Sequence, residues 1–208
     1  MAEFNSTTFG TISGRHGSAV ASTIKKSGKS VLKVFRAPSN PQTDKQVSQR
    51  TKFAFVLAFM VGLRELFKTT FSGNGGYNQA VSLALKYAVK GDVSNFSIDF
   101  SKLTVAGGTL ECVKEATATV KAGTTVKIDW VNKHGETQKL YSSVNFVFFV
   151  ANWNESVLEQ DGAESVAKTA EIELPAEWAG QKVHCWMYYS KPDGIQKSGS
   201  YYISEVQL

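Results

Sequence analysis

The sequence predicts an α+β fold in which an N-terminal β-hairpin and two helices precede an all-β sandwich. Hydrophobic residues follow the helical period over much of residues 43–90, and from about residue 94 they change to the strand period of two. Turn signals such as KAGTT, NKHGE and KPDG then recur at short intervals. We therefore expect two domains, residues 1–93 and residues 94–208.

The hairpin is predicted from two β-leaning runs, SAVASTI and SVLKVF, which are separated by the Gly-containing segment KKSGK. A two-stranded hairpin alone is marginally stable in water. We therefore expect it to lie on a helix or on another subunit.

The long helix predicted over residues 43–70 has an unusual middle, FAFVLAFMVGL (53–63), that is apolar on nearly every side. A helix that is apolar all round is normally buried all round. The hairpin and a shorter second helix, QAVSLALKYAVK, with Asn78 as its cap, would cover only part of it. We expect copies of the chain to cover the rest, with these residues at the subunit interface: Phe53, Phe55, Val56, Phe59, Met60 and Leu63.

The C-terminal part reads as a sandwich of the immunoglobulin or fibronectin type III kind. Its alternating runs are NFSIDF, TVKIDWV, VNFVFFVANW, AKTAEIEL, KVHCWMYY and SYYISEVQL. An alternative function is open here, a carbohydrate- or protein-binding module that uses surface aromatic residues, namely Trp153, Trp178, Trp186, Tyr188 and Tyr201.

Charge is divided unevenly along the chain. Residues 1–95 hold 13 Lys and Arg against four Asp and Glu, whereas residues 96–208 hold 10 against 14. This asymmetry is compatible with association between copies or with phosphate binding. Nucleic acid is therefore the alternative partner, and its contacts would be the basic residues of the hairpin: Lys25, Lys26, Lys29, Lys33 and Arg36.

No pattern predicts catalysis, a metal site or a cofactor. The three histidines lack ligand spacing, and GKS at 28–30 lies between two β runs instead of opening a helix as a P-loop does. Cys112 and Cys185 are expected to be reduced thiols. No signal peptide or membrane-spanning run is visible, so we expect a cytoplasmic protein at synthesis, with no membrane partner.

The segments GTISGRHGS and NPQTDKQVSQRTKF, in this order, resemble a family of unknown function found in Bacteroidota genomes and their phage-like regions. The matching positions are Gly10, Ile12, Ser13, Gly14, Gly17, Val34, Pro38, Asn40, Pro41, Thr43, Gln46, Arg50 and Phe53. The resemblance implies no activity, but its virus-like setting implies a structural role, in a virion or a similar particle. The leading prediction is a non-enzymatic protein that assembles with itself.

Overall fold

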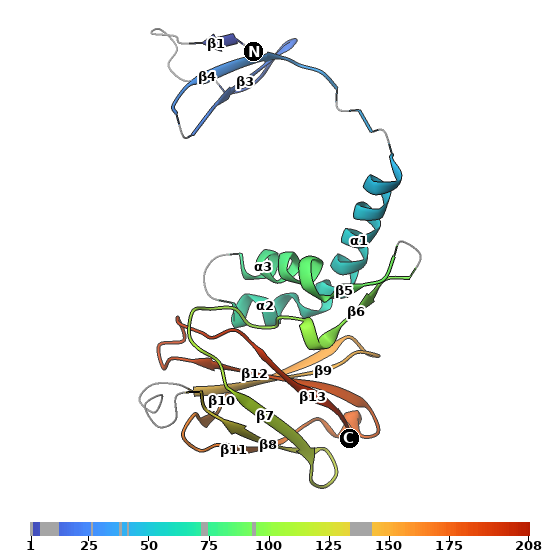
Figure 1. Cartoon of the computed structure of the whole chain (residues 1–208), viewed down its shortest axis with the longest axis vertical. Coiled ribbons are helices and arrows are strands. Elements are labelled where there is room, and N and C mark those ends of the chain that lie inside the picture. The colour runs from blue at the N-terminus through green and yellow to red at the C-terminus, as the bar shows by residue number, and fades with distance from the viewer. Residues whose placement is uncertain are drawn as a thin grey trace. The chain divides into compact units, whose positions relative to one another are not determined.

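The computed structural model describes residues 2–4, 13–25, 27–37, 39–40, 42–71, 75–92, 95–133 and 143–208. The chain forms two compact units, Met1–Thr43 and Asp44–Leu208. Figure 1 labels most of the helices and strands of each.

The first unit is one antiparallel sheet with the strand order β1-β4-β3-β2. Its strands are β1 (Ala2–Phe4), β2 (Gly14–His16), β3 (Ala19–Thr23) and β4 (Ser30–Val34). The predicted hairpin is confirmed as β3 and β4, and Gly28 in their turn has φ 67°, a left-handed value that glycine adopts without steric cost. The additional strands β1 and β2 make the sheet wider than the sequence predicts.

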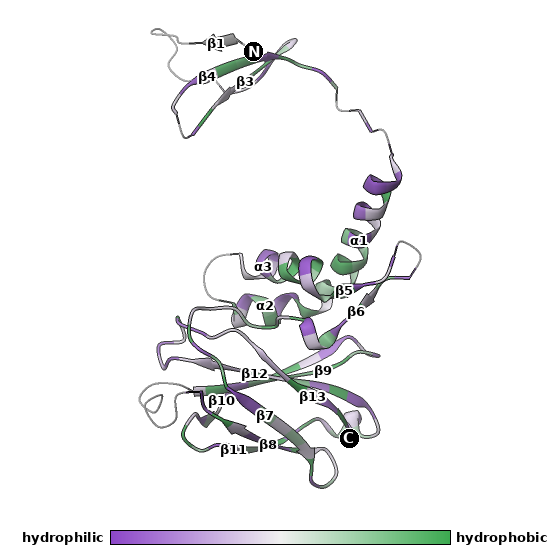
Figure 2. Ribbon diagram, viewed as in Figure 1, coloured by the Kyte–Doolittle hydropathy of each residue, from purple (hydrophilic) through white to green (hydrophobic). Residues whose placement is uncertain are grey.

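The second unit begins with the predicted long helix. The helix α1 (Asp44–Met60) continues through the 3₁₀ turn η1 (Val61–Leu63) into α2 (Arg64–Thr70). Figure 2 shows that the first turns of α1 are hydrophilic and its last turns hydrophobic. The second helix is α3 (Gly76–Leu83), followed by the π-helical turn η2 (Ala84–Ala88). Gly75 is its N-cap, so the prediction that Asn78 caps it is wrong.

Two antiparallel sheets pack as a sandwich in the rest of the unit. One sheet has the order β10-β9-β12-β13 and the other β11-β8-β7. Their strands are β7 (Glu115–Val120), β8 (Thr125–Val131), β9 (Ser143–Val150), β10 (Glu155–Glu164), β11 (Thr169–Glu173), β12 (Lys182–Ser190) and β13 (Tyr201–Gln207). A small pair, β5 (Val89–Lys90) and β6 (Ser97–Ile98), and the 3₁₀ turns η3 (Phe100–Lys102) and η5 (Ala176–Trp178) complete it.

The strands β9 and β12 are buried on both faces. One set of their side chains, including Phe146, Phe148 and Cys185, joins the core between the two sheets. The alternate set packs against the helices: Val147, Phe149, Trp186 and Tyr188. The unit therefore has three layers, helices on a sheet on a sheet, as Figure 1 shows.

This layering differs from the division expected near residue 94. The helices lie in the same compact unit as the sandwich, and the first unit ends at Thr43. The physical reason is that the helix-facing side of β9 and β12 is apolar and needs a cover. The α+β class is confirmed, and so is a sandwich of antiparallel sheets.

One predicted turn is a bulge inside a strand. EQDGAE belongs to β10, whose pairing with β9 shifts between Glu159 and Ala163. Asp161 there has φ 53°, and its N–H donates to Oδ1 of the buried Asn145 at 3.1 Å. A β-bulge of this kind accommodates extra residues without ending the strand.

Candidate assembly surfaces

One face of the N-terminal sheet carries no Lys, Arg, Asp or Glu in β2, β3 and β4, and His16 of β2 lies on it opposite Ala19. Residues opposite each other in an antiparallel pair share a face, and here Ala19 faces Val34 while Ala21 faces Leu32. We call this side the apolar face, and its residues in β3 and β4 are Ala19, Ala21, Thr23, Ser30, Leu32 and Val34. Val34 is 75% exposed and Leu32 is 38% exposed, whereas Ala21 is 4% exposed. Among the described residues of Met1–Thr43 there is no helix or second sheet to cover them.

The other face is basic. Arg15 lies opposite Val20, and Val20 lies opposite Lys33, so both cations are on the side that carries Val31. The guanidinium of Arg15 lies 3.9 Å from the centre of the Phe35 ring, a cation–π contact that fixes its direction.

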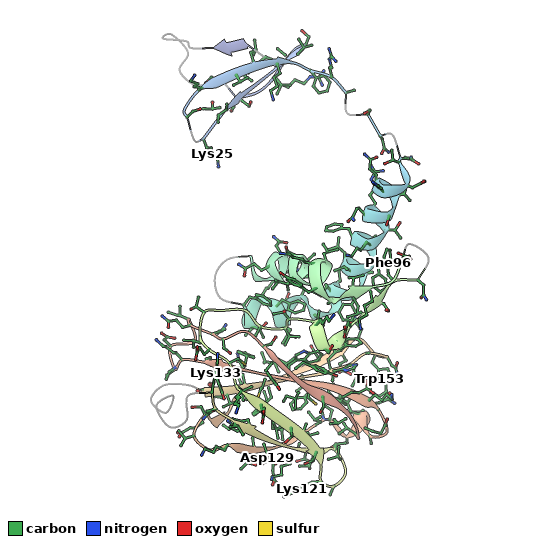
Figure 3. The ribbon with its side chains drawn as sticks, viewed as in Figure 1. Lys25, Phe96, Lys121, Asp129, Lys133 and Trp153 are labelled. Atoms are coloured by element: carbon green, nitrogen blue, oxygen red, sulfur yellow. The ribbon has the colours of Figure 1, made fainter. Side chains whose placement is uncertain are left out.

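The predicted phosphate contacts are thus spread over the hairpin. Lys25 is exposed at the turn between β3 and β4 (Figure 3), and Lys29 ends the same turn. Lys33 lies on the basic face, Arg36 follows β4 and is exposed, and Lys26 lies outside the described residues. The structure therefore does not gather these cations into one pocket.

All of the net charge resides in this unit. Met1–Thr43 holds six Lys and Arg against one Glu, a balance of +5, and Asp44–Leu208 holds 17 against 17. The boundary after Thr43 therefore separates a basic unit from a neutral one, which the boundary expected after residue 93 does not do.

The structure divides the six residues predicted for the subunit interface. Val56, Met60 and Leu63 are fully buried in the core beneath the helices, and this half of the interface prediction is corrected. Phe55 and Phe59 are half-buried against the same core. Of the six, only Phe53 is largely accessible, at 47% exposure.

The half-buried rings pack against aromatic partners in their own unit. The Phe59 ring meets Phe149 of β9 at 5.6 Å and Phe100 at 6.0 Å, both edge to face. Phe55 meets Phe96 at 6.0 Å. The sandwich sheet thus covers one side of the apolar helix, the side that carries Val56, Met60 and Leu63.

One apolar groove stays open on the helical layer. It lies between α1 and α3–η2 and has a volume of about 430 Å³. We call it the α1–α3 groove, and its lining residues are Phe53, Leu57, Asn78, Val81, Ser82, Leu85 and Lys86. Lys86 is the one charged residue of the lining, and its ammonium lies 5.0 Å from the centre of the Tyr87 ring.

The aromatic residues predicted for a binding module are mostly inside. Trp178, Trp186 and Tyr188 are buried, and their positions in the core correct the prediction that they lie on the surface. The indole N–H of Trp178 donates to Glu155 Oε2 at 3.1 Å, and that of Trp186 to the Leu103 carbonyl at 3.2 Å. Tyr201 is half-buried, and only Trp153 stands exposed (Figure 3).

The titratable groups considered next, His184 and the two cysteines, lie in or beside the core. His184 stacks on Phe100 at 4.0 Å and shares a hydrogen bond of 3.2 Å between Nδ1 and Tyr202 Oη. Burial lowers its pKa. Both cysteines are free, and burial raises the pKa of the Cys185 thiol to about 12. In the described part of the chain, no three His, Cys, Asp or Glu residues gather as a metal site.

No helix among the described residues has both the length and the hydropathy that crossing a bilayer requires.

These features define a class: an α+β protein whose three-layer body is joined to a basic antiparallel sheet, and the described part of that sheet exposes apolar side chains. Residues 11–204 match the protein family described as a family of unknown function (DUF6266). The chain belongs to this family. A search of curated proteins finds no match.

Proposed function

We propose that this protein is a non-enzymatic structural protein that associates with copies of itself through its N-terminal sheet. The observation that carries the proposal is the apolar face, on which Leu32 and Val34 are exposed. A sheet face of this kind is stable when another layer covers it. Full burial of a Leu or Val side chain contributes about 1.5–3 kcal/mol, so a neighbouring chain that covers this face gains directly from it.

The role of the apolar helix is narrower than the sequence suggests. Val56, Met60 and Leu63 serve the core of their own chain. What α1 offers to a neighbour is its accessible side at Phe53 and the groove beside it. The N-terminal sheet is therefore the principal contact surface in this proposal.

The test is the mass of the intact chain in solution, measured by light scattering, for two matched variants. Val34→Asp places a carboxylate on the apolar face and is expected to return the protein to single chains. Ser22→Asp places the same group on the opposite face of the adjacent strand, where Ser22 is exposed and pairs with Val31. We expect this control to keep the wild-type mass. Equal masses for all three proteins would refute the proposal.

A nucleic-acid partner is the second candidate, favoured by the +5 balance of Met1–Thr43 beside a neutral second unit. The logarithm of an affinity that depends on phosphates falls linearly with the logarithm of salt concentration, and the slope reports how many phosphates the protein neutralises. Replacing Lys25, Lys33 and Arg36 by alanine should flatten that slope by about one unit for each phosphate that is no longer neutralised. A mass that does not change on nuclease treatment, together with no binding at low salt, would remove this candidate.

The virus-like setting of the resemblance extends the proposal to the form of the assembly. We propose a closed or filamentous particle, such as part of a virion, built from many copies. Negative-stain images at high protein concentration test this, since a discrete dimer alone would contradict it.

A further inference from the structure

We infer that a small anion, one that carries a carboxylate or a phosphate group, binds in a polar pocket at one end of the sheet β10-β9-β12-β13. We call it the sheet-end pocket, and the lining residues that carry the argument are Asn145, Asp161, Tyr188, Ser190, Lys191 and Lys197. It lies within Asp44–Leu208, and the inference does not depend on the proposed self-association. Its volume of about 250 Å³ is below the roughly 300–1,000 Å³ of sites for drug-sized ligands, so a ligand here is small.

The pocket forms where the helix-facing side of β9 and β12 changes from apolar to polar. Val147 and Trp186 pack against the helices, and two residues further along the strands Asn145 lies opposite Tyr188. Asn145 is 2% exposed, and Ser190, the last residue of β12, is 5% exposed. A buried polar side chain costs free energy unless it is hydrogen-bonded, and an apolar residue at either position would extend the core. The two polar residues therefore give this end of the sheet a different chemistry.

Hydrogen bonds of Asn145 fix the geometry of the pocket. Its Oδ1 accepts the Asp161 N–H at 3.1 Å, and its amide donates to Ser190 Oγ at 2.8 Å. Ser190 thus accepts one hydrogen bond and keeps its own proton to donate. Asp161 has the left-handed φ of 53°, a conformation that costs free energy in a residue other than glycine and that is found often at binding sites.

Two lysines give the lining its excess of positive charge. Lys191 and Lys197 lie on the two sides of a turn, in which the Lys191 N–H donates to the Gln196 carbonyl at 2.9 Å, and both lysines are half-buried. Among the described residues, neither ammonium forms an ion pair with a carboxylate. The Lys197 ammonium donates to the Thr69 carbonyl at the end of α2, which leaves it two further N–H groups, and burial lowers its pKa. An anion would stabilise the charged form of this partly desolvated cation.

The carboxylates of the lining and of the turn are Asp161 and Asp193. Asp161 is the one acidic residue of the lining, against two lysines, so the balance of the lining is +1. Asp193 Oδ1 accepts the N–H groups of Ile195 at 2.9 Å and Gln196 at 3.4 Å, and its charge is used within the turn. Burial and the Asp161 charge raise the pKa of Tyr188 to about 12, so its hydroxyl keeps the proton and can donate. Cationic and hydroxyl donors of this kind are what an anion requires.

Equilibrium dialysis of the intact chain tests the site, because it counts bound anions whatever the state of assembly. Radiolabelled phosphate and radiolabelled malonate are the two probes, each at constant ionic strength in sodium chloride. We expect at least one of them to bind saturably, with a single class of site on each chain. The probe that binds shows whether the pocket takes a phosphate or a carboxylate, and no saturable binding of either overturns the inference.

Three variants separate this pocket from general attraction to a basic protein. Lys191→Met should weaken binding about tenfold or more, whereas the control Lys114→Met, at an exposed position just before β7, should leave it within about threefold. Asp161→Asn should tighten binding several-fold, because it removes a like charge and asparagine tolerates the left-handed backbone. Lys197 is not replaced, since its contact with Thr69 also supports the end of α2. Equal losses for the two lysine variants, or an Asp161→Asn variant that binds no more tightly than the wild type, would overturn the inference.

Discussion

The clearest prediction concerns two fragments that begin at different boundaries. A protein of residues 44–208 keeps the helical layer, whereas a protein of residues 94–208 lacks it. Four side chains of β9 and β12 would then lose much of their cover, each at most 1% exposed in the intact chain: Val147, Phe149, Trp186 and Tyr188. Full burial of a large apolar side chain contributes about 1.5–3 kcal/mol, so the loss is about 6–12 kcal/mol.

That loss is as large as the whole stability of a typical domain, about 5–15 kcal/mol. We therefore expect residues 44–208 to unfold cooperatively on heating and to show near-UV circular dichroism from packed tryptophans. Residues 94–208 should lack that signal and bind a hydrophobic dye, as loosely packed states do. A 94–208 fragment that unfolds cooperatively within a few degrees of the longer one would refute the three-layer reasoning.

Three further predictions follow from single positions. Met60→Ala should destabilise the protein by about 2–5 kcal/mol in denaturant titration because Met60 is fully buried. Phe53→Ala should change the stability by less than about 1 kcal/mol, since Phe53 is exposed. Equal losses of stability would contradict the burial of the side of α1 that carries Met60. Burial lowers the pKa of His184 in the folded protein, so the neutral side chain stabilises the fold above pH 6.5, and this stabilisation is lost as the pH falls below that value. His184→Phe should remove this part of the pH dependence of Tm. A variant whose Tm depends on pH as the wild type does would contradict the prediction. Gly108→Ala should cost about 1–3 kcal/mol because a Cβ there collides with the Lys197 carbonyl oxygen, whereas Gly199→Ala, where a Cβ has open space, should be nearly neutral in the same thermal scan.

Local periodicity was sufficient to predict most elements. The apolar stripe and its polar start predicted a long helix, and the structure has continuous helical turns over Asp44–Thr70. The run TVKIDWV predicted a strand with the bounds that β8 has. Two strands of the sandwich were missed: β7 (EATATV) is weakly apolar, and β10 contains the charged EQDGAE segment, whose bulge depends on Asn145, 16 residues away.

The domain boundary was predictable from a signal that the alternating pattern concealed. FVFFV (146–150) and CWMYY (185–189) are apolar at consecutive positions, which indicates strands covered on both faces. One face belongs to the sandwich, so the other requires a helical layer, and the preceding apolar helix is that layer. The same reasoning shows why Val56, Met60 and Leu63 are core residues, whereas the sequence assigned them to a neighbouring subunit.

The uncovered surfaces could be found only with the register of the sheet in hand. Strand alternation puts Val34 and Lys33 on opposite faces, and the pairing with Ala19 and Val20 shows which side chains of the neighbouring strand share each face. Likewise, the groove brings Phe53 and Leu85 together from two helices. Both surfaces arise from tertiary geometry that composition and periodicity do not encode.

The central claim is that Met1–Thr43 presents a sheet face that another chain covers. The most direct test is sedimentation of the intact chain beside residues 44–208 over a range of concentrations. The account predicts an intact protein heavier than the 22.7 kDa of one chain, and a shorter protein that remains a single chain. An intact protein that stays at 22.7 kDa throughout the range would contradict it.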